Sequence, residues 1–200
     1  MNHQYKVTII GDTNVGKSSM ITRLIRNKFE LMPVTTIGAA FNNYRVPSDK
    51  TEDVIELHIW DTAGQERYKC LVPLYVRGTH AVVMVYAVDN HESKENLIKQ
   101  WYPFVREHSD VERIYICGNK VDMGSTNTIE HGEFMEGMRR VCPKGKFFVT
   151  SAKMGYGVKE LFDTVAQDLH ESDCVPLNSS LINLSSSNYH SLKKYLCCSS

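Results

Sequence analysis

The sequence predicts a three-layer α/β fold, in which a six-stranded, mostly parallel sheet carries helices on both faces. Six short runs rich in β-branched and apolar residues alternate with segments whose apolar residues recur at helical spacing. Such an alternation is typical of sheets covered by helices on both sides. One run, 81–88, is almost wholly apolar, as expected of a strand buried on both faces of a parallel sheet.

Each element follows from its local pattern. The run 5–10 ends on a glycine and predicts a strand, and the spacing of Met20, Ile21, Leu24 and Ile25 predicts a helix over 17–29. A turn at 47–50 joins two further strands. The remaining predicted elements are strands 41–46, 54–60, 81–88, 113–117 and 147–150, and helices 92–108, 130–140 and 158–169.

Composition narrows the function classes. Lysine plus arginine number 23, as do aspartate plus glutamate, so the formal net charge is zero. Binding a nucleic-acid backbone needs a concentrated positive surface, and we therefore expect no nucleic-acid partner. The first residues lack the basic-then-apolar profile of a signal peptide, and no apolar run approaches the roughly 20 residues of a membrane span.

A phosphate-binding loop follows the first predicted strand. Residues 11–18, GDTNVGKS, fit the pattern G-x-x-x-x-G-K-[ST] between a strand and a helix. Glycines let backbone N–H groups close around phosphate oxygens, and the N-terminus of the following helix attracts anions. We expect Lys17 to neutralise β- and γ-phosphate charge and Ser18 to bind Mg²⁺ through its hydroxyl.

Polar motifs end three other strands, where ligands bind in such sheets. Asp61 lies where a carboxylate can hold Mg²⁺ through a water, Gly64 allows close approach to the γ-phosphate, and Gln65 can orient an attacking water. Asp122, in GNKVD, can accept two hydrogen bonds from the N1–H and 2-amino groups of guanine, a pair of donors that adenine lacks. Residues 151–153, SAK, can bring a backbone N–H to the guanine O6.

In order and spacing, these motifs resemble the Ras-type small GTPases. The resemblance rests on the phosphate loop, Thr36, DTAGQ (61–65), NKVD (119–122) and SAK. Within that group, IGAAF (37–41), LHIW (57–60), ERY (66–68) and YVRG (75–78) resemble the Rab family, and Ala39-Ala40 is similar to its early-endosomal branch. The resemblance covers about residues 5–170 and, separately, the end of the chain, and it implies the Ras-like P-loop NTPase fold.

The resemblance also implies roles for single residues. Thr36 binds Mg²⁺ and the γ-phosphate, Phe29 and Lys120 flank the guanine ring, and Ala152 donates its amide to O6. Phe41, Trp60 and Tyr75 match the aromatic triad that Rab proteins present to effectors, with plain strand packing as the alternative. Gln65 is the predicted catalytic residue, and the Mg²⁺ set is Ser18, Thr36 and, through water, Asp61. The predicted nucleotide-binding residues are Thr13, Asn14, Val15, Gly16, Lys17, Ser18, Ser19, Phe29, Thr36, Gly64, Asn119, Lys120, Asp122, Ser151, Ala152 and Lys153.

The predicted function is a GTP-dependent switch that binds and slowly hydrolyses GTP to control vesicle traffic. The resemblance implies an exchange factor, a GTPase-activating protein, effectors and a prenyl-binding chaperone as partners. It places the protein on the cytoplasmic face of endosomal membranes, with cycling through the cytosol. A module that binds GTP with little or no hydrolysis is one alternative, because Thr13 and Asn14 crowd the loop. A metabolic kinase is another, although it would have no use for NKVD or SAK.

The sequence divides into two parts. Residues 1–172 are expected to form the GTP-binding domain, and residues 173–200, rich in serine and asparagine, a flexible tether. Cys197 fits a C-a-a-X box, which predicts one farnesyl group. The Rab resemblance implies instead geranylgeranyl groups on both Cys197 and Cys198, and two lipids anchor a protein more stably than one.

Overall fold

The structure is a computed structural model, and it describes residues 2–31, 35–123 and 128–174. Six strands form one sheet in the order β2-β3-β1-β4-β5-β6. All neighbouring strands are parallel except β2, which pairs antiparallel with β3. The predicted six-stranded, mostly parallel sheet is thus confirmed. The strands are β1 (Asn2–Ile10), β2 (Ala39–Pro47), β3 (Val54–Thr62), β4 (Ala81–Ala87), β5 (Arg113–Asn119) and β6 (Lys146–Val149).

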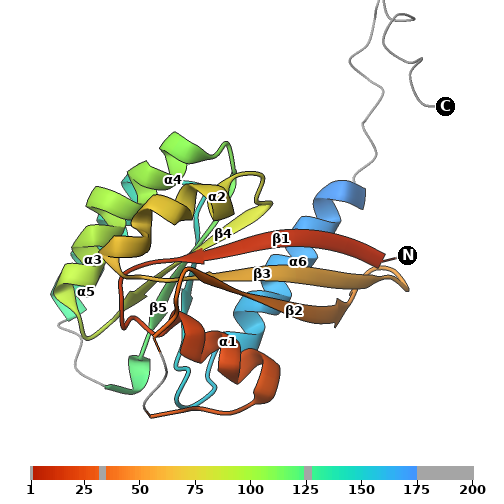
Figure 1. The fold of residues 1–200 in the computed structure, drawn as a ribbon, viewed down its shortest axis with the longest axis horizontal. Coiled ribbons are helices and arrows are strands. Elements are labelled where there is room, and N and C mark those ends of the chain that lie inside the picture. Colours follow the sequence, from red (N-terminus) through yellow and green to blue (C-terminus); the bar gives the residue numbers. More distant parts are fainter. Residues whose placement is uncertain (1, 32–34, 124–127, 175–200) are drawn as a thin grey trace, which may run out of the picture.

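Helices cover both faces of this sheet (Figure 1). Helices α1 and α6 pack on one face, and α2, α4 and α5 pack on the other. Between β3 and β4, the short helices η1 and α2 are elements that the sequence pattern does not predict. The helices are α1 (Lys17–Arg26), η1 (Glu66–Leu71), α2 (Val72–Val76), α3 (His91–Asn96), η2 (Leu97–Trp101), α4 (Tyr102–His108), η3 (Val121–Met123), α5 (Thr128–Val141) and α6 (Val158–Cys174).

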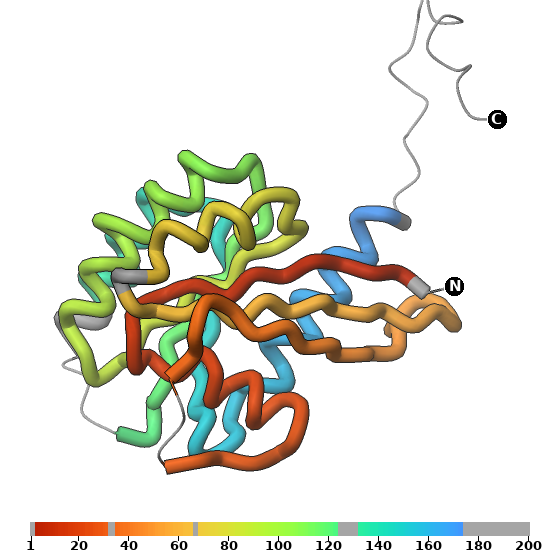
Figure 2. The backbone as a smooth tube through the Cα atoms, in the orientation of Figure 1, coloured from red at the N-terminus to blue at the C-terminus, as the bar shows by residue number. Residues whose placement is uncertain are grey.

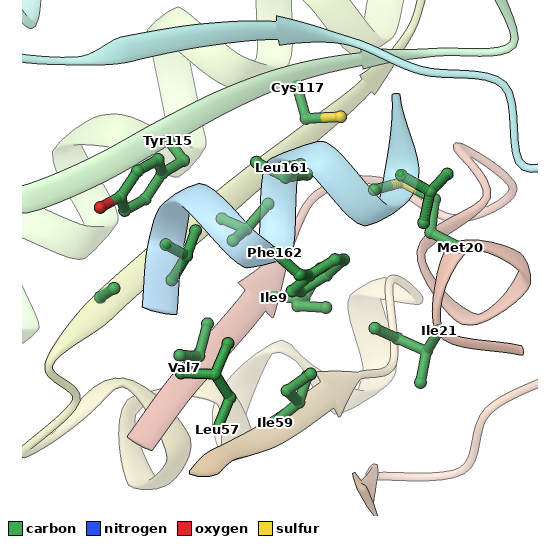
Figure 3. Packing of buried hydrophobic residues seen from close by; sticks show 14 of the residues in the cluster. Val7, Ile9, Met20, Ile21, Leu57, Ile59, Tyr115, Cys117, Leu161 and Phe162 are labelled. Atoms are coloured by element: carbon green, nitrogen blue, oxygen red, sulfur yellow. The ribbon is translucent and has the colours of Figure 1, made fainter. Parts of the chain in front are cut away.

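Strand β4 shows how the core is divided between the two faces. Its seven residues are all buried, and they alternate between two apolar clusters. Val83 and Val85 join the cluster beneath α1 and α6, whereas Met84 and Tyr86 join the cluster beneath α2, α4 and α5. Figure 3 shows the first cluster, in which Phe162 of α6 lies among side chains of β1 and β3. Side chains of successive strand residues point to opposite faces, so an all-apolar strand serves both layers.

The first helix and the helix predicted over 92–108 differ from their predicted form. Helix α1 ends at Arg26 rather than at Phe29, because Asn27 adopts a left-handed conformation with φ of 52° and donates its backbone N–H to the carbonyl of Arg23. Phe29 therefore lies outside the helix. The predicted helix 92–108 begins at His91, after Asn90 caps it by accepting a hydrogen bond from the Ser93 amide. Its middle, η2, is a π-helical turn, a feature that often marks functional sites.

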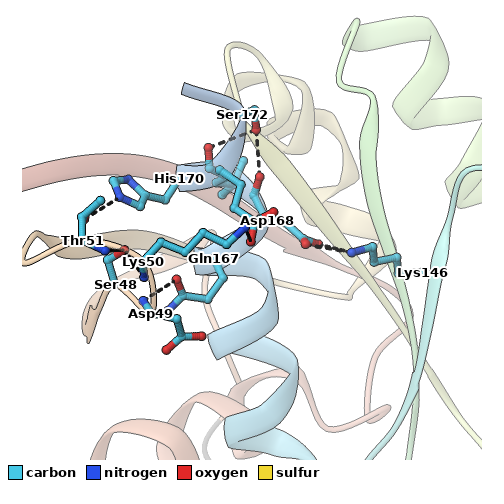
Figure 4. A network of polar contacts seen from close by, with 11 residues as sticks. Ser48, Asp49, Lys50, Thr51, Lys146, Gln167, Asp168, His170 and Ser172 are labelled. Atoms are coloured by element: carbon cyan, nitrogen blue, oxygen red, sulfur yellow. Dashed lines mark hydrogen bonds and ion pairs between the residues drawn. The ribbon is translucent and has the colours of Figure 1, made fainter. Parts of the chain in front are cut away.

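Helix α6 continues through Cys174, beyond the predicted helix end at residue 169 and the expected domain boundary at residue 172. Its second half is tied by polar contacts to the β2–β3 hairpin (Figure 4). Gln167 accepts a hydrogen bond from the amide of Asp49, and the ring of His170 contacts the Thr51 hydroxyl. Figure 2 shows that the hairpin and the start of β1 lie at the same end of the molecule as the last turn of α6. Among the described residues, no helix is both long and apolar enough to span a bilayer.

Candidate nucleotide-binding site

The phosphate loop connects the end of β1 to the first turn of α1 and packs tightly on the ends of β4 and β5. Gly11 has φ of +141°, and a Cβ added there would lie 2.1 Å from the carbonyl oxygen of Val85. Gly16 has φ of +95°, and a Cβ there would lie 2.3 Å from Nδ2 of Asn119. Neither position admits a side chain, so the two glycines set the close approach of the loop to the strand ends.

Lys17 places a buried ammonium group at the phosphate end of the site. The residue is 5% exposed, and its Nζ donates to the carbonyls of Gly11 at 2.8 Å and Asp12 at 2.7 Å. Burial lowers the pKa of Lys17 to about 8, against the opposing effect of the Asp61 and Asp12 carboxylates. A poorly solvated cation beside the N-terminus of a helix strongly favours an anionic ligand.

Oxygen ligands suited to Mg²⁺ gather beside this lysine. The hydroxyls of Ser18 and Thr36 lie 2.8 Å apart. Asp61 is 3% exposed, and its Oδ1 has no hydrogen-bond partner among the described residues. Burial raises the pKa of Asp61, while a hydrogen bond from Ser18 and the charge of Lys17 lower it. Because an orphaned buried carboxylate oxygen is costly, the set fits a hard divalent cation with oxygen ligands.

A cavity of about 250 Å³, called the phosphate cavity below, lies over the phosphate loop. Gly64 and Gln65 form part of its wall, and a Cβ at Gly64 would lie 2.5 Å from both the Asp12 carbonyl oxygen and Lys17 Nζ. The segment after β3 is therefore held against the loop, and Gln65 lies in the wall of the cavity above it. The cavity is lined by Thr13, Asn14, Gly16, Lys17, Ser18, Ser19, Thr35, Thr36, Thr62, Gly64 and Gln65.

A second cavity, of about 260 Å³, continues the first. The two share Asn14, Gly16 and Ser19, so they are adjacent halves of one elongated site. The second half brings together the side chains that sequence analysis assigns to the base. Its lining includes Phe29, Asn119, Lys120, Asp122, Ala152 and Lys153.

Asn119 joins three loops around this half of the site. Its Nδ2 donates to the carbonyl of Val15 at 2.9 Å. Its Oδ1 accepts hydrogen bonds from the Thr150 hydroxyl and the Ala152 amide, each at 3.1 Å. The side chain is buried, with 1% exposure, and it therefore acts mainly by holding the loops in register.

The carboxylate of Asp122 is also held in place. The hydroxyl of Ser151 donates to its Oδ1, and the Nζ of Lys153 lies 3.9 Å from its Oδ2. Ser151 and Val15, both predicted to bind nucleotide, do not line either cavity. Ser151 instead positions Asp122, and Val15 belongs to the core while its carbonyl anchors Asn119.

The predicted effector residues form a continuous aromatic surface. Phe41 on β2 pairs directly with Trp60 on β3. The ring centroids of Phe41 and Trp60 lie 5.3 Å apart, as do those of Trp60 and Tyr75. Phe41 is 50% exposed, which favours a contact surface over plain strand packing. Cys197 and Cys198 lie outside the described residues.

Two residues of the site have roles that sequence analysis misses. Arg23 donates to the carbonyls of Ala152 and Lys153, which lie about 130 residues further along the chain. Asp12, at a variable position of the loop motif, accepts hydrogen bonds from Trp101 and Asn96. No local pattern signals such long-range pairs, since each depends on how α1 and η2 dock on the sheet.

A glycine-containing phosphate loop, a buried lysine and a group of oxygen atoms that fits a divalent cation together define a P-loop nucleotide-binding protein. The model of the Ras family matches residues 6–171 of the chain. The chain is 34% identical over 197 residues to the Ras-related protein Rab-5A of Dictyostelium discoideum, covering 98% of this chain and 96% of that protein. It is also 34% identical to the GTP-binding protein YPT52 of Saccharomyces cerevisiae, covering 84% and 82%, and 38% identical to the Ras-related protein Rab-8B of Pongo abelii, covering 84% and 79%. The chain belongs to the Ras family of small GTPases, among its Rab proteins.

Proposed function

We propose that this GTPase binds guanine nucleotide along the two joined cavities and works as a switch in vesicle traffic at endosomal membranes. The observation that carries the proposal is the single elongated site, with Lys17 at one end and Asp122 at the other. A nucleoside triphosphate placed along it has its phosphates at the lysine and its base at the carboxylate. Asp122 then accepts hydrogen bonds from N1–H and the 2-amino group of guanine, and the backbone N–H of Ala152 donates a hydrogen bond to O6.

Mg²⁺ would be held by the hydroxyls of Ser18 and Thr36 and, through water, by Asp61. When bound, it neutralises charge on the phosphates and orients them for attack. Thr36 and Gly64 each contact the phosphate end of the site. In the GTP-bound protein they hold the segments that precede β2 and follow β3 against the γ-phosphate, and hydrolysis removes this anchor.

Hydrolysis relies on Gln65, whose amide orients the attacking water. Among the described residues that line the phosphate cavity, Lys17 is the only cation. The side chain of Arg23 is engaged at Ala152 and Lys153, away from this cavity. Intrinsic turnover is therefore slow, on the order of 10⁻⁴ per second, and an arginine supplied by an activating partner can raise it by roughly 10³–10⁵.

Single-turnover hydrolysis tests the catalytic part of the proposal. Gln65→Leu should abolish most of the activity that an activating protein stimulates and lower the intrinsic rate, because leucine cannot orient water. Gln4→Leu, at an exposed position of β1 that lines neither cavity, is the matched control. An intrinsic rate for Gln65→Leu equal to that of the parent would remove Gln65 from the mechanism.

Base selection has its own test. Asp122→Asn replaces an acceptor with a donor, so the variant should lose GTP affinity and gain affinity for xanthosine triphosphate, which carries a carbonyl where guanine carries its amine. Competition against a fluorescent nucleotide measures both affinities. Retention of GTP affinity without that gain would show that Asp122 does not read the base.

The membrane part of the proposal rests on the family and on the chain end. Cys197 and Cys198 carry prenyl groups, the segment 173–200 tethers the domain, and a prenyl-binding chaperone returns it to the cytosol. The similarity of Ala39-Ala40 to the early-endosomal branch of the Rab family supports an endosomal location. Intact mass of the native protein distinguishes zero, one and two lipids. Imaging of a Cys197→Ser/Cys198→Ser variant should show loss of endosomal membrane signal, and unchanged membrane association would contradict the anchor.

The alternative, a module that binds GTP with little or no hydrolysis, is favoured by one observation, that Thr13 and Asn14 both line the phosphate cavity. In this alternative, their side chains leave too little space for the water and for an incoming arginine. Phosphate release from GTP and from ATP, with and without an activating protein, separates the two cases. If the activating protein raises phosphate release from GTP but not from ATP, the hydrolysing switch is supported. If it raises neither, the module with little or no hydrolysis is supported.

A further inference from the structure

Arg23 lies in the last turn of α1 and bonds to two segments on either side of the base half of the site. Its Nε donates to the carbonyl of Ala152 at 2.8 Å, and its Nη2 donates to the carbonyl of Lys153 at 2.7 Å. Its Nη1 donates to the backbone oxygen of Asn27 at 3.0 Å and to the Asn27 Oδ1 at 3.2 Å. One guanidinium thus spans the end of α1 and the loop after β6.

Both segments help to form the walls of the second cavity, which the proposed function assigns to the base and which is called the base cavity below. Ala152 and Lys153 line it directly, and Ala152 presents the amide assigned to the guanine O6. Asn27 is the left-handed C-cap of α1, and two residues later Phe29 enters the same cavity. The conformation at Asn27 decides the direction in which the chain leaves the helix, and so it decides where the Phe29 ring lies.

The charge environment shows why an arginine suits this position. Among the described residues Arg23 forms no ion pair, and all of its hydrogen-bond acceptors are oxygens of peptide or amide groups. A cation in the last turn of a helix is stabilised by the helix dipole. The fork of donors in a guanidinium reaches several acceptors at once, which the single ammonium of lysine does not reproduce.

We propose that Arg23 is a positioning residue that holds the two walls of the base cavity together and thereby sets the lifetime of bound guanine nucleotide. The inference rests on the proposed assignment of this cavity to the base. It concerns release of nucleotide rather than chemistry, because the contacts of Arg23 lie at the base half and Gln65 lies at the phosphate half.

The test is the dissociation rate of a fluorescent GDP from the full chain with Mg²⁺, chased with excess GDP. Arg23→Ala should release GDP about tenfold to a hundredfold faster, the range for losing hydrogen bonds from a charged group. Arg23→Lys should fall between this variant and the parent. Arg26→Ala, three residues later and exposed on the same helix, should match the parent within about twofold.

Single-turnover hydrolysis of bound GTP separates positioning from general loosening. For Arg23→Ala the rate constant should stay within about twofold of the parent, because the phosphate half keeps its contacts. Parallel changes in release and hydrolysis would refute the inference, as would release at the parental rate. If Arg23→Ala fails to fold, the release rate and hydrolysis of Arg23→Lys decide by the same criteria. A parent that does not prefer guanine over adenine nucleotides would instead overturn the base-site assignment itself.

Discussion

The bond between Trp101 and Asp12 offers a quantitative test of how the phosphate loop is held. The indole Nε1 of Trp101 donates to Oδ1 of Asp12 at 2.7 Å, and Nδ2 of Asn96 donates to Oδ2 at 2.8 Å. Trp101 is 4% exposed, so the indole N–H has little access to water. A hydrogen bond to a charged acceptor contributes about 1.5–3 kcal/mol, and Trp101→Phe removes this donor while keeping an aromatic ring.

Trp101→Phe also leaves a small void where the larger indole ring was. A double-mutant cycle separates the loss of the hydrogen bond from the effect of this void. Urea unfolding of the nucleotide-free parent, Trp101→Phe, Asp12→Ala and the double variant gives four free energies of unfolding. We expect the double variant to be more stable than the sum of the single losses predicts, with a coupling free energy of about 1.5–3 kcal/mol. A coupling below about 0.5 kcal/mol would show that the bond does not hold the loop.

Three further predictions follow from burial. Lys17 has a pKa of about 8 in the folded protein and 10.5 without burial, so the unfolded chain binds more protons between these values. The free energy of unfolding of the nucleotide-free parent should therefore rise by about 3 kcal/mol from pH 8 to pH 10.5 relative to Lys17→Met, and an equal pH dependence of the two would contradict the burial of charge. Phe162 is fully buried, so Phe162→Ala should lower the free energy of unfolding by about 3–5 kcal/mol in urea titrations, and a loss below about 1 kcal/mol would refute its place in the core. Burial raises the pKa of Cys117 to about 12, whereas Cys70 is exposed. Peptide mass spectrometry after a thiol reagent at pH 8 should find Cys70 modified in the native protein and Cys117 only after unfolding.

The sequence predicts those features of the fold and the site that depend on residues near one another in the chain. The run 81–88 specifies a buried strand because its side chains are apolar on both faces, and β4 is buried throughout. The glycines of the phosphate loop mark positions that exclude a side chain, and the structure shows the carbonyl of Val85 against Gly11. The strand-end motifs lie close together because the carboxyl ends of parallel strands lie at the same edge of the sheet. The parallel topology is therefore enough to predict that they share one site.

Contacts between distant segments escape such prediction. The helical period of 92–108 gives no sign of the π turn at η2, which carries Trp101 toward Asp12. The spacing of apolar residues predicts that α1 ends at Phe29, yet the left-handed Asn27 ends it earlier, since asparagine tolerates that conformation. Nothing in the sequence around Arg23 indicates its contacts, and only the docking of α1 beside the loop after β6 shows that it bonds to Ala152.

The three bonds of Asn119 make three loops mutually dependent. Its amide combines one donor group, used by Val15, with one acceptor oxygen, used by Thr150 and Ala152. An aspartate here would set a carboxylate oxygen against the Val15 carbonyl, and a glutamine would push the acceptor one methylene further. Over evolutionary time, therefore, the phosphate loop, the end of β5 and the loop after β6 are not free to diverge independently. A change in the backbone of one must be matched in the other two, or the amide loses a partner.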